Sequence, residues 1–331
     1  MPLNDFNIQF EKPHKIFFSG EVVKGQVIVD LSQEMKFLEI KLELVGWGKV
    51  QWAEVQQNTN QYNEYNTTTT LVFSESEQYF KEEMVVHKGP SLLPGLHILP
   101  FSVLLPSNLP TSYEGLHGHV RYYVQADIVR DLKWSHKVKQ HLMVNGILDL
   151  NLYPSAQAPG HSTDHKKLCC LCCKSGPITA TIHSNRTGYV PGEMIGFNAE
   201  VDNLSNRDMS SSSLNLVEEV TYRATTKSRT KRRVVEKIRR GMINPGTSDY
   251  WEGVVMKVPV IPPTGLAGNC SIIDVQYSLE LNVDPSGPAY DLVVRTPLIV
   301  GTIPLKQYIP TLVPSSESEC PGGAPDLEQF K

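Results

Sequence analysis

The chain has 331 residues, of which 40% are hydrophobic and 20% charged, and its formal net charge is −4. This length predicts about two domains, since a typical domain holds roughly 100–200 residues. The composition is that of an ordinary globular protein and excludes a largely disordered chain, and the slightly acidic balance excludes a general attraction to nucleic acid.

The first residues do not resemble a secretory signal. Residues 1–12 carry charged side chains and lack an apolar core. The most apolar window, 92–106, is interrupted by Pro94 and Pro100 and is too short to span a membrane. We therefore expect a cytoplasmic protein, in which cysteines serve as free thiols, lipid acceptors or metal ligands before disulfides.

Apolar and polar side chains alternate with a period of two through both halves of the chain. In the segment 37–44, Leu or Ile occupies the even positions and Glu or Lys most of the odd ones. Such alternation predicts an antiparallel strand with one buried face. It recurs at 25–31, 120–128, 178–182, 195–201, 254–260 and 273–283. No window of about 12 residues keeps a helical apolar stripe free of proline, so the sequence predicts an all-β fold of sandwiches.

Polar segments divide this pattern. Residues 56–70 and 203–213 are expected to be loops, the first as the tip of a long hairpin. Residues 154–167 are expected to link a first domain over 1–153 to a second over 168–305. From 306 to 331, Pro, Ser, Glu and Gly predominate, which predicts a short flexible C-terminal tail.

An internal repeat indicates that the two domains are alike. A seven-residue pattern occurs once in each half: Phe17-x-x-Gly20-Glu21-x-Val23 and Tyr189-x-x-Gly192-Glu193-x-Ile195. In both, a glycine after an aromatic residue is expected to form a turn with a positive φ before a strand. Later in each half, a proline precedes another alternating strand. Two matches in the same order predict a duplicated sandwich.

The whole set of segments resembles the arrestin-domain-containing proteins of the α-arrestin family. The resemblance is carried in chain order by 17–25 (FFSGEVVKG), 42–46, 99–101, 109–124, 168–178 (LCCLCCKSGPI), 188–193 and 297–305 (PLIVGTIPL). It implies two arrestin-like, immunoglobulin-like β-sandwich domains in tandem, without enzymatic activity or cofactor. It also implies an adaptor in protein transport that binds membrane protein cargo tails for ubiquitin-dependent endocytosis or endosomal sorting. Such a protein would be cytoplasmic and peripheral at the plasma membrane or endosomes.

The resemblance has one departure. Similar vertebrate proteins carry a long tail with PPxY motifs, which dock on WW domains of HECT-type ubiquitin ligases. Residues 306–331 hold no PPxY, and Pro262-Pro263 is followed by Thr264-Gly265. We therefore expect ubiquitin ligases to be indirect partners, recruited through another adaptor.

The densest charge lies at 227–240, where eight basic residues accompany one acid. The basic residues are Lys227, Arg229, Lys231, Arg232, Arg233, Lys237, Arg239 and Arg240. Because Arg and Lys pair with phosphate, this run is a candidate contact for anionic lipid headgroups or a phosphorylated cargo tail. The alternative is the solvated face of an exposed hairpin centred on Val234 and Val235. No aromatic residues interleave with the charges, which speaks against nucleic acid as a partner.

Four clustered cysteines allow three interpretations: Cys169, Cys170, Cys172 and Cys173. With His161 and His165 they have ligand types suited to zinc, but adjacent cysteines on an extended chain point to opposite faces. Clustered cysteines beside Lys166 and Lys167 would also suit S-palmitoylation at a membrane surface. The third interpretation is a set of small buried thiols. We assign no metal site here, and we expect Cys270 to be an inert buried thiol.

Two other functions remain open beside the adaptor. A retromer-type arrestin-like scaffold would assemble with a coat partner instead of capturing cargo. A zinc- or thiol-dependent redox protein would use the cysteine cluster at 169–173. The chain contains no G-x-S-x-G, P-loop or H-E-x-x-H motif, and we expect no enzyme.

Overall fold

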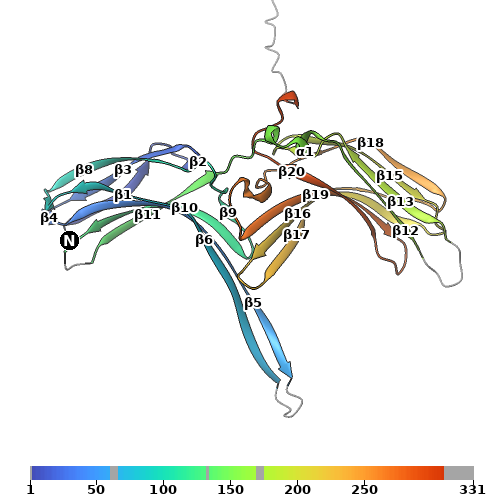
Figure 1. The fold of residues 1–331 in the computed structure, drawn as a ribbon, viewed down its shortest axis with the longest axis horizontal. Helices are drawn as coiled ribbons and strands as arrows, with labels where there is room; N and C mark the ends of the chain where they lie inside the picture. The colour runs from blue at the N-terminus through green and yellow to red at the C-terminus, as the bar shows by residue number, and fades with distance from the viewer. Residues whose placement is uncertain (1, 60–65, 132–133, 169–174, 309–331) are drawn as a thin grey trace, which may run out of the picture.

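The computed structural model describes residues 2–59, 66–131, 134–168 and 175–308, which form two β-sandwiches side by side (Figure 1). The predicted all-β fold with two tandem sandwiches is confirmed. In the described residues the helices are single turns: η1 (Leu150–Leu152), α1 (Pro154–Gln157), η2 (Thr264–Ala267) and η3 (Lys306–Tyr308).

The first sandwich has two main sheets. The smaller runs β1 (Leu3–Phe10), β3 (Val22–Leu31), β8 (Gly95–Leu104). The larger runs β2 (Ile16–Phe18), β11 (His136–Asn145), β10 (Gly118–Val129), β5 (Glu39–Thr59), β6 (Asn66–Lys88), and β9 (Tyr113–Glu114) also pairs with β10. A two-stranded ribbon of β4 (Met35–Lys36) and β7 (Ser91–Leu92) completes this domain.

The second sandwich repeats the plan. One sheet runs β12 (Gly160–Lys167), β13 (Pro177–Ser184), β15 (Met194–Asn203), β18 (Thr247–Lys257). The other runs β14 (Gly188–Tyr189), β20 (Leu292–Val300), β19 (Ile273–Pro285), β16 (Met209–Arg223), β17 (Ser228–Arg240). In β19 the alternate residues Ile273, Val275, Leu279 and Leu281 are fully buried, as the period of two predicts.

The larger sheets of the two domains have the same strand order. Each begins with a short parallel pair, β2 with β11 and β14 with β20, and continues with antiparallel neighbours. The hairpin β5–β6 therefore occupies the position that the hairpin β16–β17 occupies in the second domain. This equivalence agrees with the predicted duplication.

The repeated Gly-Glu pattern forms the same turn in both domains. Gly20 and Gly192 have φ angles of 81° and 94°, a conformation that favours glycine. The carboxylate of Glu21 accepts a hydrogen bond from a backbone N–H three residues earlier, and Glu193 does the same, each at 2.9 Å. The pattern therefore marks equivalent strand starts.

Three segments differ from the expectation of loops. The expected linker 154–167 contains the helix α1 and the strand β12. The sequence does not predict this strand, because β12 is an edge strand whose side chains are mostly exposed and polar and therefore lack apolar alternation. Residues 209–213 are the start of β16, and 56–59 and 66–70 belong to the hairpin strands β5 and β6.

The basic run is also arranged differently. Apart from Lys227, which lies in the preceding turn, it forms the single strand β17 at the edge of its sheet, not a hairpin centred on Val234 and Val235. The turn that makes its hairpin lies earlier, between β16 and β17. Val235 lies at the irregularity where β17 shifts register against β16. The expected tail residues 309–331 lie outside the described residues.

Candidate functional site

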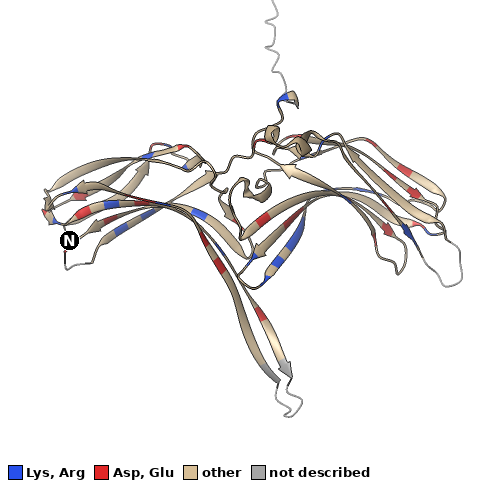
Figure 2. Ribbon diagram, viewed as in Figure 1, with Lys and Arg blue, Asp and Glu red and all other residues tan. Residues whose placement is uncertain are grey.

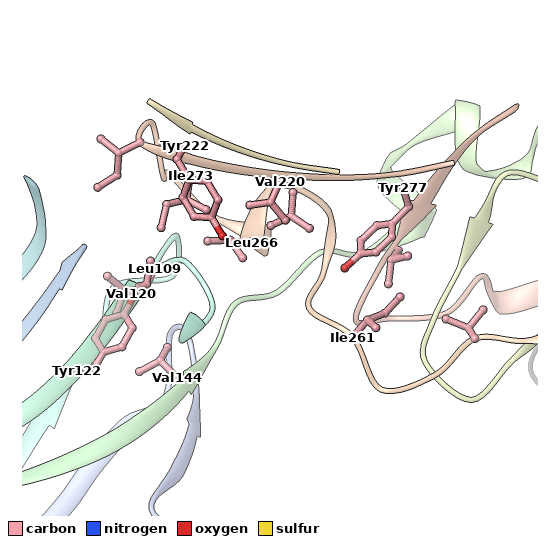
Figure 3. Packing of buried hydrophobic residues seen from close by; sticks show 14 of the residues in the cluster. Leu109, Val120, Tyr122, Val144, Val220, Tyr222, Ile261, Leu266, Ile273 and Tyr277 are labelled. Carbon is pink, nitrogen blue, oxygen red and sulfur yellow. The ribbon is translucent and has the colours of Figure 1, made fainter. Parts of the chain in front are cut away.

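The two domains meet through a continuous hydrophobic core (Figure 3). Leu109, Val120 and Tyr122 of the first domain and Tyr222 and Leu266 of the second belong to one cluster of buried side chains. The hydroxyl of Tyr122 donates to the carbonyl of Pro110 at 2.6 Å, which fixes the loop nearest the second domain. Apolar contacts of this kind hold the walls of any cleft between the domains in one arrangement.

Polar groups close one side of this core. The hydroxyls of Tyr113 and Tyr222, one from each domain, lie 3.2 Å apart. A Cβ atom added to Gly115 would lie 2.4 Å from the Tyr222 hydroxyl, so only glycine allows this approach. Burial raises the pKa of Tyr113 above its usual value of 10.0, so its hydroxyl stays a hydrogen-bond donor even at alkaline pH.

A cleft of about 1020 Å³ lies between the domains. This volume is at the top of the roughly 300–1,000 Å³ typical of small-molecule sites, and it suits a peptide segment. The first domain lines the cleft mainly with residues 111–116, which include β9, and with Phe18 and Met143. The second domain contributes residues of β16, β17 and the loop 260–263.

Much of the lining is exposed and apolar. The side chains of Leu116 and Val260 are 73% and 96% exposed, and Phe18 and Met143 are half-exposed. Because isolated large apolar side chains are ordinary at a surface, the significant fact is that these four converge on one cleft. This apolar part of the site was not predicted from the sequence, since its residues come from four separate segments.

The predicted basic residues form the opposite part of the lining. Lys231, Arg232 and Arg233 of β17 contact the cleft. Lys231 and Arg233 lie opposite Val220 and Glu218 of β16 in the antiparallel register, so they share the face that is turned to the first domain. Figure 2 shows the line of basic residues along β17 and the acidic residues on the neighbouring hairpin β5–β6.

Four of the eight predicted basic side chains pair with carboxylates. Lys227 pairs with Glu54 of the first domain, Arg232 with Glu219 and Glu280, Arg233 with Glu218, and Arg240 with Asp249. Arg239 donates to the hydroxyl of Ser211 at 3.2 Å. Arg229, Lys231 and Lys237 have no carboxylate at ion-pair distance among the described residues, which leaves their charge open to a ligand.

Glu218 connects this strand to the interior. Its carboxylate is 4% exposed and accepts hydrogen bonds from Arg233 and, at 3.2 Å, from the hydroxyl of Tyr277. The same hydroxyl lies 2.8 Å from the carbonyl oxygen of Pro262, so its single proton is shared between the two acceptors. Arg233 itself is 63% exposed, so part of its guanidinium still faces the cleft. A buried carboxylate thus orients a cation at the cleft wall.

A second contact between the domains lies along β6. Its alternate residues Phe73, Glu75, Glu77 and Tyr79, here called the β6 seam, all approach the second domain. Glu75 accepts a hydrogen bond from the Thr225 hydroxyl at 2.5 Å. Glu77 accepts one from the backbone N–H of residue 271 at 3.0 Å, and the Tyr79 hydroxyl lies 3.0 Å from the sulfur of residue 270. The sequence analysis did not identify this surface, although the alternation F-x-E-x-E-x-Y at 73–79 places these four side chains on one face of a strand.

Of the cysteines discussed above, the structure describes Cys270. The cluster at 169–173 lies outside the described residues. Cys270 is partly buried, and burial raises the pKa of its thiol, which lowers the thiolate fraction at neutral pH. Within the described part of the chain, no group of three or more His, Cys, Asp or Glu side chains is arranged to hold a metal ion. No helix among the described residues is long and apolar enough to cross a membrane.

Known proteins match the chain over nearly its whole length. The family model "Arrestin (or S-antigen), N-terminal domain" matches residues 6–151, and "Arrestin (or S-antigen), C-terminal domain" matches 174–305. Arrestin domain-containing protein 17 of Caenorhabditis elegans is 31% identical over 96% of the chain and 74% of its own length. Human arrestin domain-containing protein 4 is 32% identical over 92% and 73%, and human thioredoxin-interacting protein is 27% identical over 91% and 75%.

Proposed function

The chain belongs to the arrestin family, in its α-arrestin branch, and from this premise we propose that it is an adaptor that binds membrane protein cargo in the cleft between its domains. One observation carries the proposal: β17, a basic strand at the edge of its sheet, forms a wall of that cleft. An edge strand offers unpaired backbone groups to an extended peptide, and neighbouring pockets then select its side chains. The protein would act by binding and not by catalysis.

The lining favours an acidic or phosphorylated cargo segment. Lys231 and the exposed part of Arg233 lie two residues apart on one face of β17, so a single anionic group can approach both. The apolar lining of Leu116 and Val260 would take an apolar side chain of the same segment. Recognition would therefore combine charge with apolar contact.

The same strand supports a peripheral position at the cytoplasmic face of the plasma membrane or endosomes. Lys237, further along β17, is exposed and has no carboxylate at ion-pair distance within the described ranges. Such cations attract anionic lipid headgroups at roughly 1 kcal/mol each near a membrane surface. Bound cargo would then be passed to ubiquitin ligases through another adaptor, for endocytosis or endosomal sorting.

The test uses two matched variants of the full chain. Lys231→Glu/Lys237→Glu reverses charge on β17, and the control Lys24→Glu/Lys257→Glu makes the same charge change on exposed residues away from the cleft. Each form is purified from cells, and its partners are identified by mass spectrometry. We expect the wild type and the control to recover transmembrane cargo and ubiquitin ligases, and the β17 variant to lose the cargo.

Other outcomes would redirect the proposal. Equal cargo recovery by both variants would contradict a role for β17. A stoichiometric coat complex without cargo would favour the retromer-like scaffold. Sedimentation with phosphatidylserine vesicles distinguishes a lipid contact, because the β17 variant would then lose vesicle binding even when no cargo is present.

A thiol-dependent function has weaker support. One relative is named thioredoxin-interacting protein, which raises the question of a reactive cysteine. Cys270 does not suit that role, because its raised thiol pKa disfavours the nucleophilic thiolate. Cys169, Cys170, Cys172 and Cys173 remain candidates for S-palmitoylation. Intact mass and metal analysis of protein from eukaryotic cells would detect an acyl chain or a bound zinc ion.

A further inference from the structure

The turn between β16 and β17 contacts the first domain at two of its four residues. The turn is closed by a hydrogen bond of 2.8 Å from the backbone N–H of Ala224 to the carbonyl of Lys227. Within it, the Thr225 hydroxyl donates to Glu75, and the Lys227 ammonium pairs with Glu54. The hydroxyl of one threonine and the charge of one lysine thus tie this turn to the hairpin β5–β6.

The surroundings of Thr225 are acidic on the side of the first domain. Glu54, Glu75 and Glu77 all accept hydrogen bonds or ion pairs from the second domain along this junction. The carboxylate of Glu75 is ionised at neutral pH, and the hydrogen bond from Thr225 stabilises this charged form and holds its pKa below the usual value. A donor at position 225 is therefore stabilising, whereas an anion there would be repelled.

We propose that Thr225 is a phosphorylation site whose phosphate separates the β16–β17 turn from the β6 seam. A protein kinase would transfer the terminal phosphoryl group of ATP to Oγ1 of Thr225. The new O–P bond forms as the bond to ADP breaks, and the hydroxyl proton passes to the base of the kinase. Thr225 is exposed, and Arg223 and Lys227 beside it would complement a kinase with an acidic substrate groove.

The phosphate acts on both contacts of the turn. It replaces the hydroxyl donor by a group of charge about −1.5 to −2, which meets the carboxylate of Glu75. It also lies two residues from Lys227 and competes with Glu54 for that ammonium. Both effects have the same direction, because each removes a contact between the turn and the first domain.

The neighbouring threonine provides a matched control. Thr226 is exposed in the same turn, and its hydroxyl forms no hydrogen bond with any residue that the structure describes. A phosphate at 226 adds the same charge at nearly the same place, but it leaves the Thr225 hydroxyl on Glu75. The two positions therefore separate a specific effect from a general effect of added charge.

The experiment measures hydrogen exchange by mass spectrometry on three forms of the full chain: unmodified, with phosphothreonine incorporated during translation at 225, and with phosphothreonine at 226. We expect severalfold faster exchange at 73–79, 224–231 and 270–273 in the 225 form alone. Unchanged exchange in the 225 form, or an equal increase in both phosphorylated forms, would overturn the proposal.

Two further measurements fix the site and the mechanism. Thr225→Val removes the donor without adding charge and should raise exchange less than the phosphate does; an equal rise would show that charge plays no part. Phosphosite mapping of the protein purified from cells should find phosphate at Thr225, and phosphate confined to other residues would overturn the assignment. The inference does not depend on what the cleft binds.

Discussion

The hairpins β5–β6 and β16–β17 occupy the same place in their two domains but differ in length and charge. The strands of the first are 21 and 23 residues long, and this hairpin extends far beyond the sandwich (Figure 1). Those of the second are 15 and 13 residues long and stay within the sheet. The hairpin β5–β6 is acidic along its β6 seam, whereas the strand β17 of the hairpin β16–β17 is basic.

The comparison of the two hairpins shows which positions of the repeated sheet can change their side chains. The inward residues of β16, such as Leu214 and Leu216, and those of β5, such as Ile40 and Leu42, are equally buried and apolar. Most of the difference in charge lies at outward and edge positions, because they do not have to fit a core. The buried carboxylate of Glu218 in β16 is an exception, and it is paired with Arg233. In this molecule the two hairpins have complementary charges, and they contact each other through Lys227 with Glu54 and Thr225 with Glu75.

The largest expected effect comes from the shared core beneath the hairpins. Tyr222 of β16 is 2% exposed and packs edge-on against His117 of the first domain. Tyr222→Ala should lower the free energy of unfolding by about 3–5 kcal/mol, the usual range for a large buried aromatic side chain. Val72→Ala, at an exposed position of β6, should change it by less than about 0.5 kcal/mol. Urea unfolding measures the free energy of both variants. Similar losses would contradict the inference that β16 packs into the shared core while this part of β6 is exposed.

The ion pair within each hairpin gives a smaller and more selective effect. Arg233→Met leaves the buried carboxylate of Glu218 with the Tyr277 hydroxyl alone, and we expect a loss of about 1–3 kcal/mol. Lys81→Met removes the corresponding pair with Glu83 on β6, where both side chains are exposed, and should leave the urea midpoint unchanged.

A second variant checks the physical reason. If the loss in Arg233→Met comes from an unpaired buried charge, Glu218→Gln in the same chain should recover part of it, because a neutral amide is less costly to bury. A double variant less stable than Arg233→Met by the full effect of Glu218→Gln would show instead that the two residues contribute independently.

The sequence predicted two β-sandwiches and a dense basic run, but not that this run forms an edge strand or how that strand is used. The charge density identified the basic run that includes β17. Alternation identified β3, β5, β10, β13, β15 and β19, but not β20 or the mostly buried β16. It missed β12, because an edge strand with mostly exposed side chains has no apolar period. It also missed that Arg232 and Arg233 are held by Glu280 and Glu218, since these pairs depend on strand register and on residues far apart in sequence. The cleft could not be predicted from the sequence either, because its lining residues come from both domains.

The smallest expected effect is the pH dependence of the contact between the two hairpins. The hydrogen bond from Lys227 holds the pKa of Glu54 below its usual value of 4.5, and that from Thr225 does the same for Glu75. A carboxylate whose pKa is lowered by folding stabilises the folded state above its unfolded pKa and loses this contribution as the pH falls through its folded pKa. The stability of the wild type should therefore exceed that of Glu54→Gln/Glu75→Gln at pH 7, and the difference should shrink below about pH 4.5. Other carboxylates with lowered pKa, such as Glu21, titrate equally in both proteins and cancel in the difference. Urea unfolding of both proteins from pH 7 to pH 3 measures this difference in the free energy of unfolding. A difference that stays constant with pH would show that the two carboxylates contribute through packing and not through their charge.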